Sequence, residues 1–210
     1  MTMPTLTDRL FQDGNDEPLD PFAVFEEWFA EALAKEVNDP HAMAVATVDA
    51  DGAPDVRMVL LNARDERGFV FFTNFESAKG VQLLGQPRAA LVLHWKSVRR
   101  QVRVRGLVEV VEPGEADAYF STRARGSQIA SSASEQSRPL KSRAELIRRV
   151  EALTDKLGED PVPRPVHWSG FRIIPLEIEF WKDGAFRLHD RMLFTRDAPG
   201  KPWTRQRLFP

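Results

Sequence analysis

The chain has 210 residues, a formal net charge of −2 at pH 7 and no cysteine. The absence of cysteine excludes disulfides, thiolate metal sites and cysteine nucleophiles, and the slight acidity argues against a dedicated nucleic-acid-binding protein. Hydrophobic residues make up 42% of the sequence, which is enough for one domain with a substantial core.

The first 19 residues are mostly polar, and we expect them to form a flexible segment ahead of a single domain at 20–210. They contain no apolar stretch of the kind found in signal peptides, and no run in the chain reaches the length of a membrane span. We therefore expect a soluble, cytoplasmic protein without a membrane partner.

A helix is predicted to begin at Asp20 and Pro21, because aspartate is a good N-cap and proline fits the first helical position. Apolar residues at helical spacing then share one face of this helix, namely Phe22, Phe25, Phe29 and Leu33. A face of this kind typically packs against a core.

Short β-like runs and a few helices make up the rest of the chain. The β-like runs lie at 42–48, 54–61, 68–73, 89–95 and 99–111, with a short helix from Ser77 among them. Two helical stretches follow at 115–123 and 142–157, separated by a serine-rich loop, and a proline-rich connector leads to alternating C-terminal strands. This pattern predicts a mainly β domain, an antiparallel barrel with flanking helices.

Several common catalytic motifs are missing from the sequence. It contains no dinucleotide fingerprint, phosphate-binding P-loop, zinc-protease motif or hydrolase nucleophile motif. The four histidines lie far apart and lack metal-ligand spacing, so no metal site is predicted.

Two segments combine a β-like run with groups that bind anions. In RMVLLN (57–62), Arg57 sits in an apolar strand where its charge needs a partner. In FFTNFESAK (71–79), a strand leads into a helix N-terminus near Ser77 with Lys79 close by, and such termini bind phosphate. An ordinary capped surface helix explains the second segment equally well.

Two further segments are rich in polar donors. RRQVRVR (99–105) would place arginines and a glutamine on one strand face, but no aromatic residues interleave with them, which disfavours RNA binding. In the segment 119–137, Tyr119 and Arg123 share a helical face, and hydroxyl, amide and guanidinium groups follow. A disordered serine-rich linker is the alternative for this segment.

The segment FRLHDR (186–191) is predicted to lie in a strand after a hairpin turn. Alternation along that strand would place Arg187, His189 and Arg191 on one face. Taken alone, the segment favours a solvated edge with salt bridges to the neighbouring acidic residues, Glu177 and Glu179. Taken together with the four polar segments described above, it predicts a site for a phosphorylated small molecule whose flat ring lies between aromatic side chains.

A series of motifs runs from about residue 20 to the C-terminus and reads RMVLL, FFTN..S.K, W.S.RRQV, YF..R.RGSQI, S.QSRPL, HWSGFR, IEFW and RLHDR. The order and spacing of these motifs resemble the pyridoxine/pyridoxamine 5′-phosphate oxidase family. The resemblance implies an FMN-binding split barrel, which is a six-stranded antiparallel barrel with flanking helices. It also implies a homodimer with FMN at its interface.

The resemblance further implies roles for individual residues. Those implied in FMN binding are Arg57, Met58, Val59, Leu60, Leu61, Asn62, Phe72, Thr73, Lys79, Gln101, Gln136, Ser137, Trp181 and Arg191. Those implied in binding the substrate phosphate are Tyr119, Arg123 and Ser127, with Asn62 as a further substrate contact. Arg187 and His189 match the residues over the substrate ring and are the implied catalytic residues.

The implied reaction is the oxidation of pyridoxamine 5′-phosphate and pyridoxine 5′-phosphate to pyridoxal 5′-phosphate, with O2 as oxidant and H2O2 as product. Two alternatives remain: a related FMN oxidase of the phenazine-biosynthesis type, and a flavin- or vitamer-binding protein with little turnover. The chain departs from the family motifs at three positions where a basic residue is expected, which are Asn62, Ala78 and Glu135.

Overall fold

The computed structural model describes residues 4–14 and 17–210. In this part of the chain, nine antiparallel strands form one curled sheet in the order β2-β1-β5-β6-β7-β4-β3, and β8 and β9 extend it beside β7. The strands are β1 (Ala42–Val48), β2 (Pro54–Leu60), β3 (Ala63–Asp65), β4 (Gly68–Asn74), β5 (Arg88–Trp95), β6 (Arg100–Val110), β7 (Trp168–Lys182), β8 (Asp190–Thr195) and β9 (Thr204–Arg207). The predicted mainly β architecture is therefore confirmed.

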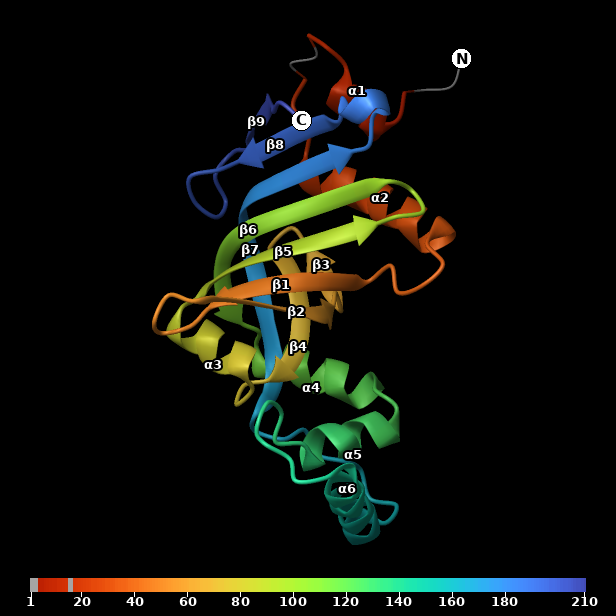
Figure 1. Cartoon of the computed structure of the whole chain (residues 1–210), viewed down its shortest axis with the longest axis vertical. Helices are drawn as coiled ribbons and strands as arrows, with labels where there is room; N and C mark the ends of the chain where they lie inside the picture. Colours follow the sequence, from red (N-terminus) through yellow and green to blue (C-terminus); the bar gives the residue numbers. More distant parts are fainter. Residues whose placement is uncertain (1–3, 15–16) are drawn as a thin grey trace.

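Helices flank this sheet and also lie beyond it at both ends of the molecule. They are α1 (Leu6–Phe11), α2 (Pro21–Lys35), α3 (Ala78–Gly85), α4 (Pro113–Thr122), α5 (Arg125–Ala133) and α6 (Arg143–Leu157), with a short 3-10 turn η1 (Ala185–Arg187). Figure 1 shows α1, β8 and β9 at one end of the long axis and α4, α5 and α6 at the other. Among the described residues, no helix has both the length and the apolar character required to cross a membrane.

Strand β7 pairs with three other strands and so connects the parts of the sheet. It pairs with β6 along most of its length, with β4 over its first half and with β8 over its second half. The pairing with β6 shifts register between Arg105 and Gly106, which bends both strands. Glycine is required at position 106, because a Cβ there would lie 1.9 Å from the carbonyl oxygen of Ile174.

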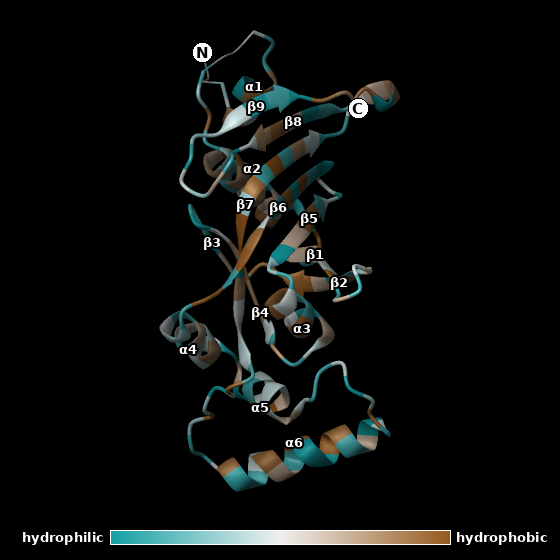
Figure 2. Ribbon diagram, turned by 90° about the vertical axis from the view of Figure 1, so that its left-hand side faces the viewer, coloured by the Kyte–Doolittle hydropathy of each residue, from teal (hydrophilic) through white to brown (hydrophobic). Residues whose placement is uncertain are grey.

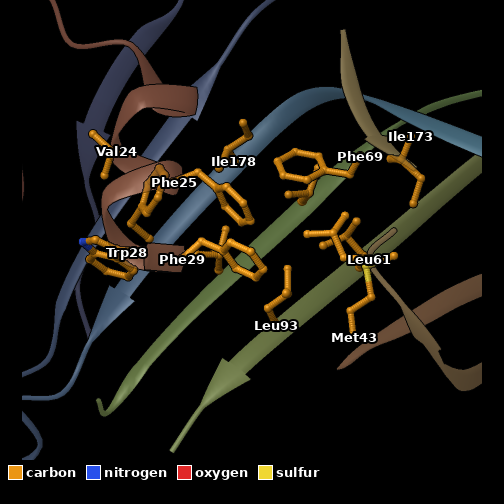
Figure 3. Packing of buried hydrophobic residues seen from close by; sticks show 14 of the residues in the cluster. Val24, Phe25, Trp28, Phe29, Met43, Leu61, Phe69, Leu93, Ile173 and Ile178 are labelled. Atoms are coloured by element: carbon orange, nitrogen blue, oxygen red, sulfur yellow. The ribbon is translucent and has the colours of Figure 1, made fainter. Parts of the chain in front are cut away.

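Helix α2 covers the sheet and supplies much of the main core (Figure 3). As predicted, the Asp20 side chain accepts a hydrogen bond from the Phe22 N–H and Pro21 occupies the first turn. The buried face comprises Phe25, Trp28, Phe29 and Ala32. The prediction for Leu33 is wrong, because the stripe runs through positions 28 and 32 and leaves Leu33 47% exposed.

The predicted flexible N-terminal segment contains a helix that the sequence analysis missed. Helix α1 begins with a capping box between Thr5 and Asp8, and Leu10 is buried. The indole N–H of Trp28 donates to the Thr7 hydroxyl at 2.8 Å, which fastens α1 to α2. A six-residue helix has too short a pattern to stand out; residues 1–3 and 15–16 of this segment lie outside the described residues.

The serine-rich segment is also helical, where the sequence predicted a loop. In α5, the hydroxyls of Ser131 and Ser132 donate to the carbonyl oxygens of Ser127 and Gln128, one turn earlier. These bonds within the helix satisfy the polar side chains that suggested a linker. Helix α6 packs against α5 and turns its other sides to solvent (Figure 2).

Candidate active site

A cavity of about 560 Å³ opens between β2, β4, α4 and α5. It is lined by eleven of the residues predicted from the sequence, which are Met58, Val59, Leu60, Asn62, Phe72, Thr73, Lys79, Tyr119, Arg123, Ser127 and Gln136. The remaining lining residues were not predicted; they are Asn74, Ala130, Ser131, Ser134 and Trp168. Trp168 was within reach of sequence reasoning, because the quoted motif HWSGFR contains it.

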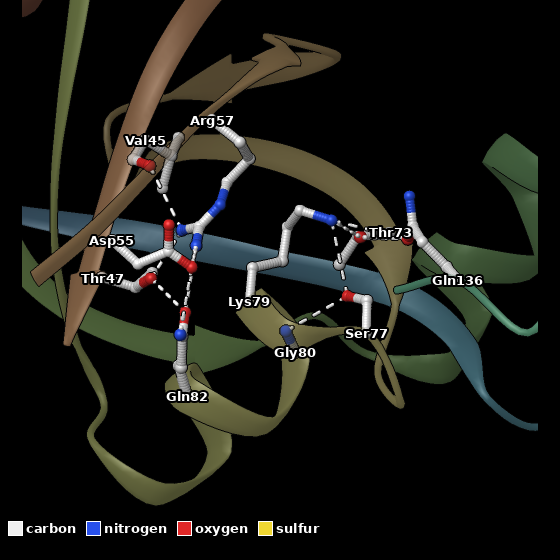
Figure 4. A network of polar contacts seen from close by, with 10 residues as sticks. All are labelled: Val45, Thr47, Asp55, Arg57, Thr73, Ser77, Lys79, Gly80, Gln82 and Gln136. Atoms are coloured by element: carbon white, nitrogen blue, oxygen red, sulfur yellow. Dashed lines mark hydrogen bonds and ion pairs between the residues drawn. The ribbon is translucent and has the colours of Figure 1, made fainter. Parts of the chain in front are cut away.

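One corner of the cavity holds a buried ammonium group (Figure 4). Lys79 is 7% exposed, and its Nζ contacts Thr73 Oγ1 at 3.3 Å and Gln136 Oε1 at 3.5 Å. Among the ion pairs of the described residues there is none for Lys79, and burial lowers the pKa of its ammonium group, with a smaller contribution from nearby Arg57. Ser77 caps the N-terminus of α3 beside it. A cation, hydroxyls and a helix N-terminus together favour a phosphate.

Arg57 lies beside this corner but does not line the cavity. Its guanidinium donates to Thr47 Oγ1 and Gln82 Oε1 and pairs with Asp55 (Figure 4). Asp55 is therefore the charged partner that the sequence predicts for Arg57, because Arg57 sits in an apolar strand. Gln82 also donates to Asp55 at 3.2 Å, and this hydrogen bond is the largest cause that lowers the pKa of the Asp55 carboxyl.

A second cation, for which the described residues supply no carboxylate partner, faces the same cavity. Arg123 donates to Ser131 Oγ at 2.8 Å, and its guanidinium lies 4.9 Å from the centre of the Trp168 ring. Burial lowers the pKa of Arg123, while the neighbouring Tyr119 opposes the shift. Ser127 lies one turn before Ser131 on α5 and lines the cavity. The predicted set of Tyr119, Arg123 and Ser127 is thus brought together.

An aromatic wall completes this cavity. The ring of Tyr119 stacks on Phe72 with centroids 4.2 Å apart, and the Trp168 ring lies nearly parallel to both, 5.3 Å from Phe72 and 6.2 Å from Tyr119. Asn62 holds the phenol in place, because its Nδ2 donates to the Tyr119 hydroxyl at 2.6 Å while its Oδ1 accepts from the Phe72 N–H.

Five more of the predicted residues, Gln101, Trp181, Arg187, His189 and Arg191, lie near the far end of β7. Trp181 pairs with Gln101 on one side and with Arg191 on the other, and the His189 ring lies 4.7 Å from the Trp181 ring. Arg191 donates to Glu179 Oε1 at 2.8 Å, which raises the pKa of Arg191. Arg187 is exposed nearby.

The predicted strand through FRLHDR is wrong. Residues 185–187 form a 3-10 turn in which Phe186 and Arg187 have φ values of 56° and 64°, and β8 begins only at Asp190. Arg187, His189 and Arg191 therefore do not alternate along one strand. The reason is that the connection from β7 is a loop, closed by the tight approach of Gly184 to the Leu188 carbonyl.

The predicted salt bridges at this edge are only partly correct. Glu179 pairs with Arg191 and also with Arg103, whereas Glu177 pairs with Arg105. Arg103 and Arg105 of β6 are thus neutralised by carboxylates of β7, and Arg100 of the same strand pairs with Glu31 of α2, which argues against RNA binding along this strand.

Two other predicted residues lie away from the cavity. Leu61 is buried in the main core, and Ser137, with a φ of 73°, lines two neighbouring hollows beside Arg138. Among the described residues, no cluster of three or more His, Cys, Asp or Glu side chains could hold a metal ion.

The two groups of predicted residues are separated by the length of β7. Thr73 pairs with Ser169 near the start of the strand, and Trp181 lies near its end. At about 3.3 Å per residue, this is about 40 Å of strand. One protomer therefore does not bring both groups to a single small ligand.

Family models match almost the whole of this structure. A model described as pyridoxamine 5′-phosphate oxidase matches residues 29–156, and one described as the pyridoxine 5′-phosphate oxidase C-terminal dimerisation region matches residues 168–210. The chain belongs to the pyridoxamine 5′-phosphate oxidase family. Membership confirms the resemblance noted in the sequence and makes the protein an enzyme of the oxidoreductase class.

Curated relatives within the pyridoxamine 5′-phosphate oxidase family are similar over most of their length. The chain is 55% identical over 210 residues to the pyridoxine/pyridoxamine 5′-phosphate oxidase of Allorhizobium ampelinum, covering 100% of both chains. It is 60% identical over 191 residues to the protein of that name from Caulobacter vibrioides, covering 91% of this chain and 85% of that protein.

Solved structures confirm the fold. PhzG from Burkholderia lata, in complex with tetrahydrophenazine-1-carboxylic acid, superposes with a TM-score of 0.87 at 33% identity, covering 96% of this chain and 98% of that one. A pyridoxamine 5′-phosphate oxidase-related, FMN-binding protein from Nostoc punctiforme has a TM-score of 0.72 at 18% identity, covering 91% and 98%. The predicted split barrel with flanking helices is thus confirmed.

Replacing Lys79 tests whether its burial is unfavourable without an anion. In phosphate-free buffer at pH 7, we expect Lys79→Met to unfold at a higher temperature than the wild type, because it removes a desolvated charge. Because the pKa of Lys79 is lowered in the folded state, the wild type gains stability as the pH rises through that pKa towards the ordinary lysine range. The difference in unfolding temperature between Lys79→Met and the wild type should therefore narrow over this pH range. Thermal unfolding across this pH range, with the exposed Lys96→Met as control, measures the effect. A Lys79→Met protein that melts below the wild type throughout would contradict it.

Proposed function

We propose that the protein binds FMN and oxidises pyridoxamine 5′-phosphate and pyridoxine 5′-phosphate to pyridoxal 5′-phosphate, consuming O2 and releasing H2O2. The observation that carries this proposal is that one cavity with an aromatic wall holds two cations, Lys79 and Arg123, that have no carboxylate partner in the described part of the chain. Two such cations suit two phosphates, one on the flavin and one on the substrate. The names of the curated relatives support the same reaction.

The Lys79 corner fits the phosphate of FMN. This phosphate would lie at the N-terminus of α3, held by Lys79, the Thr73 hydroxyl and the amide of Gln136. Arg57, which lies beside this corner without lining the cavity, would add positive charge. The backbone and side chains of Met58, Val59 and Leu60 would line the flavin ring. When bound, FMN supplies the hydride acceptor for the oxidation.

The opposite wall fits the substrate phosphate. Arg123 offers a charge-assisted donor, Ser127 adds a hydroxyl, and the Tyr119 hydroxyl can donate while it accepts from Asn62. Because both ends of the Asn62 side chain are already hydrogen-bonded, its main part in this arrangement is to orient Tyr119. A neutral side chain at this position leaves Arg123 as the principal charge of the clamp, by which we mean Tyr119, Arg123 and Ser127.

A second copy of the chain would complete the site. The distant group formed by Gln101, Trp181, Arg187, His189 and Arg191 lies at the other end of β7, and most of it falls within the matched C-terminal dimerisation region. Beside the cavity, the edge strand β2 exposes an apolar row that needs cover, with Val56, Met58 and Leu60 between 51% and 64% exposed. We infer a homodimer in which the cavity of one protomer meets the β7–β8 loop of its partner.

Arg187 and His189 would then orient the substrate ring. The Gly184 N–H donates to His189 Nδ1 at 3.2 Å, which in the neutral imidazole leaves the proton on Nε2 as a donor. Asp183 Oδ1 lies 3.1 Å from the same Nδ1. His189 can therefore hold a proton at Nε2 against a substrate oxygen or nitrogen, while Arg187 supplies a fixed charge.

Two observations favour this function over the alternatives. The chain is 55–60% identical to curated pyridoxine/pyridoxamine 5′-phosphate oxidases but 33% identical to PhzG, and no carboxylate of the described residues pairs with Arg123, as one would if it were a purely structural cation. We expect the purified protein supplied with FMN to release H2O2 steadily on addition of pyridoxamine 5′-phosphate. Turnover of a phenazine precursor alone would favour the phenazine-type oxidase, and a flavin-loaded protein that turns over neither would be a binding protein.

The clamp is tested by replacing Arg123. A charge-assisted hydrogen bond to phosphate contributes about 1.5–3 kcal/mol, so Arg123→Ala should raise KM for pyridoxamine 5′-phosphate by about 10- to 100-fold. Steady-state kinetics measure this, with the exposed Arg148→Ala on α6 as the matched control. An unchanged KM in Arg123→Ala would remove this residue from the clamp.

A further inference from the structure

A buried arginine outside the cavity is tied to the elements that carry the clamp. Arg172 on β7 is 1% exposed, and its guanidinium meets three carboxylates. These are Asp65 of β3 at 3.0 Å, Glu109 of β6 at 3.3 Å and Glu115 of α4 at 2.9 Å. A buried charge requires partners of opposite charge. Removing one member of a buried ion pair is strongly destabilising when the remaining charge is left unpaired.

The positions of two of these carboxylates link Arg172 to the cavity. Glu115 lies one helical turn before Tyr119 on α4, and Asp65 lies three residues after Asn62. The hydrogen bond of 2.6 Å between Asn62 and Tyr119 closes a ring that runs through both segments. The position of the Tyr119 hydroxyl thus depends on two segments that are both held by one guanidinium.

Apart from the ring contacts and hydrogen bonds at Tyr119 and Phe120, helix α4 has few anchors among the described residues. Its N-cap residue Glu112 makes no side-chain capping bond, and its buried residues are Ala116 and Phe120. Ala116 belongs to a small cluster separate from the main core. The other ion pair of α4 joins Asp117, which is exposed, to Arg164, and exposed pairs contribute little.

We propose that Arg172 and Glu115 are positioning residues for the clamp, since they fix the first turn of α4 and so place Tyr119 and Arg123 at the cavity wall. This inference rests on the proposed function of the clamp as the binding site for the substrate phosphate. Neither residue lines the cavity.

The matched pair Glu115→Ala and Glu109→Ala separates positioning from general stability. Each variant removes one carboxylate from Arg172, but Glu109 lies directly across from Arg172 in the β6–β7 ladder, where backbone bonds hold the strand. We expect Glu115→Ala to raise KM for pyridoxamine 5′-phosphate several-fold with kcat and FMN content unchanged, and Glu109→Ala to behave as the wild type. Glu115→Gln, which keeps an acceptor for Arg172, should restore most of the loss.

A second readout does not depend on activity. Tyr119 is the only tyrosine of the chain, so protein labelled with ring-13C tyrosine gives NMR signals from this residue alone. Its ring lies 4.2 Å from that of Phe72, and the ring current makes the signals sensitive to its position. We expect the signals to shift in Glu115→Ala and in Asn62→Ala, and to stay in place in Glu109→Ala.

The two readouts separate this inference from the proposed function. A shift in Glu115→Ala without one in Glu109→Ala supports positioning even if the wild type fails to oxidise the phosphorylated vitamer, in which case only the proposed function falls. Unchanged tyrosine signals in Glu115→Ala would overturn the positioning role. Equal shifts in Glu115→Ala and Glu109→Ala would overturn it as well, since they would mean that loss of either carboxylate loosens the region as a whole.

Discussion

The backbone hydrogen bonds of β7 fix where both groups of site residues lie, because this strand pairs with β4 near its start and with β8 near its end. The first pairing places Thr73 and Trp168 beside the cavity, and the second places Arg191 and Trp181 at the opposite end of the molecule. Ladder pairing allows no intermediate arrangement, since a shift of one residue would turn each side chain to the other face. A site that uses both groups therefore needs two chains.

Charge pairing within the protomer separates the cations that already have a carboxylate partner from those that have none among the described residues. Arg57, Arg172 and Arg191 each meet a carboxylate within the protomer, so their charges are satisfied without a ligand. Lys79 is buried and Arg123 is half-buried, neither has a carboxylate partner among residues 4–14 and 17–210, and burial lowers both pKa values. Desolvated cations of this kind reduce the stability of the empty protein, and a phosphate group would relieve that cost on binding. The proposed phosphate sites coincide with these unsatisfied charges.

Local signals in the sequence were sufficient for much of the fold. Asp20 and Pro21 start α2 as expected, the run 42–48 coincides with β1, and Ser77 caps α3. The failures occur where tertiary contacts override local pattern. Phe186 and Arg187 adopt positive φ values that a loop imposes. In α5, hydroxyls bonded one turn back make a helix from a segment whose composition indicates a linker.

The candidate site was predicted residue by residue from family motifs, but its arrangement was not. Motifs name Asn62 and Tyr119 separately, and only the fold shows that they are hydrogen-bonded to one another. The carboxylates around Arg172 come from three distant elements, a relationship that no local spacing contains. Likewise, the sequence places Arg187 and Arg123 in one site without showing that a single protomer keeps them apart.

Subunit complementation tests most directly whether each site is shared between two protomers. Arg123→Ala damages the cavity, Arg187→Ala damages the β7–β8 loop, and each variant alone should have low activity at substrate concentrations below KM. Refolding or co-expressing them in equal amounts should restore about a quarter of the wild-type activity, because half of the dimers are mixed and each mixed dimer has one intact site. If both groups acted within one protomer, every site would carry a defect, and the mixture would be no more active than the separate variants.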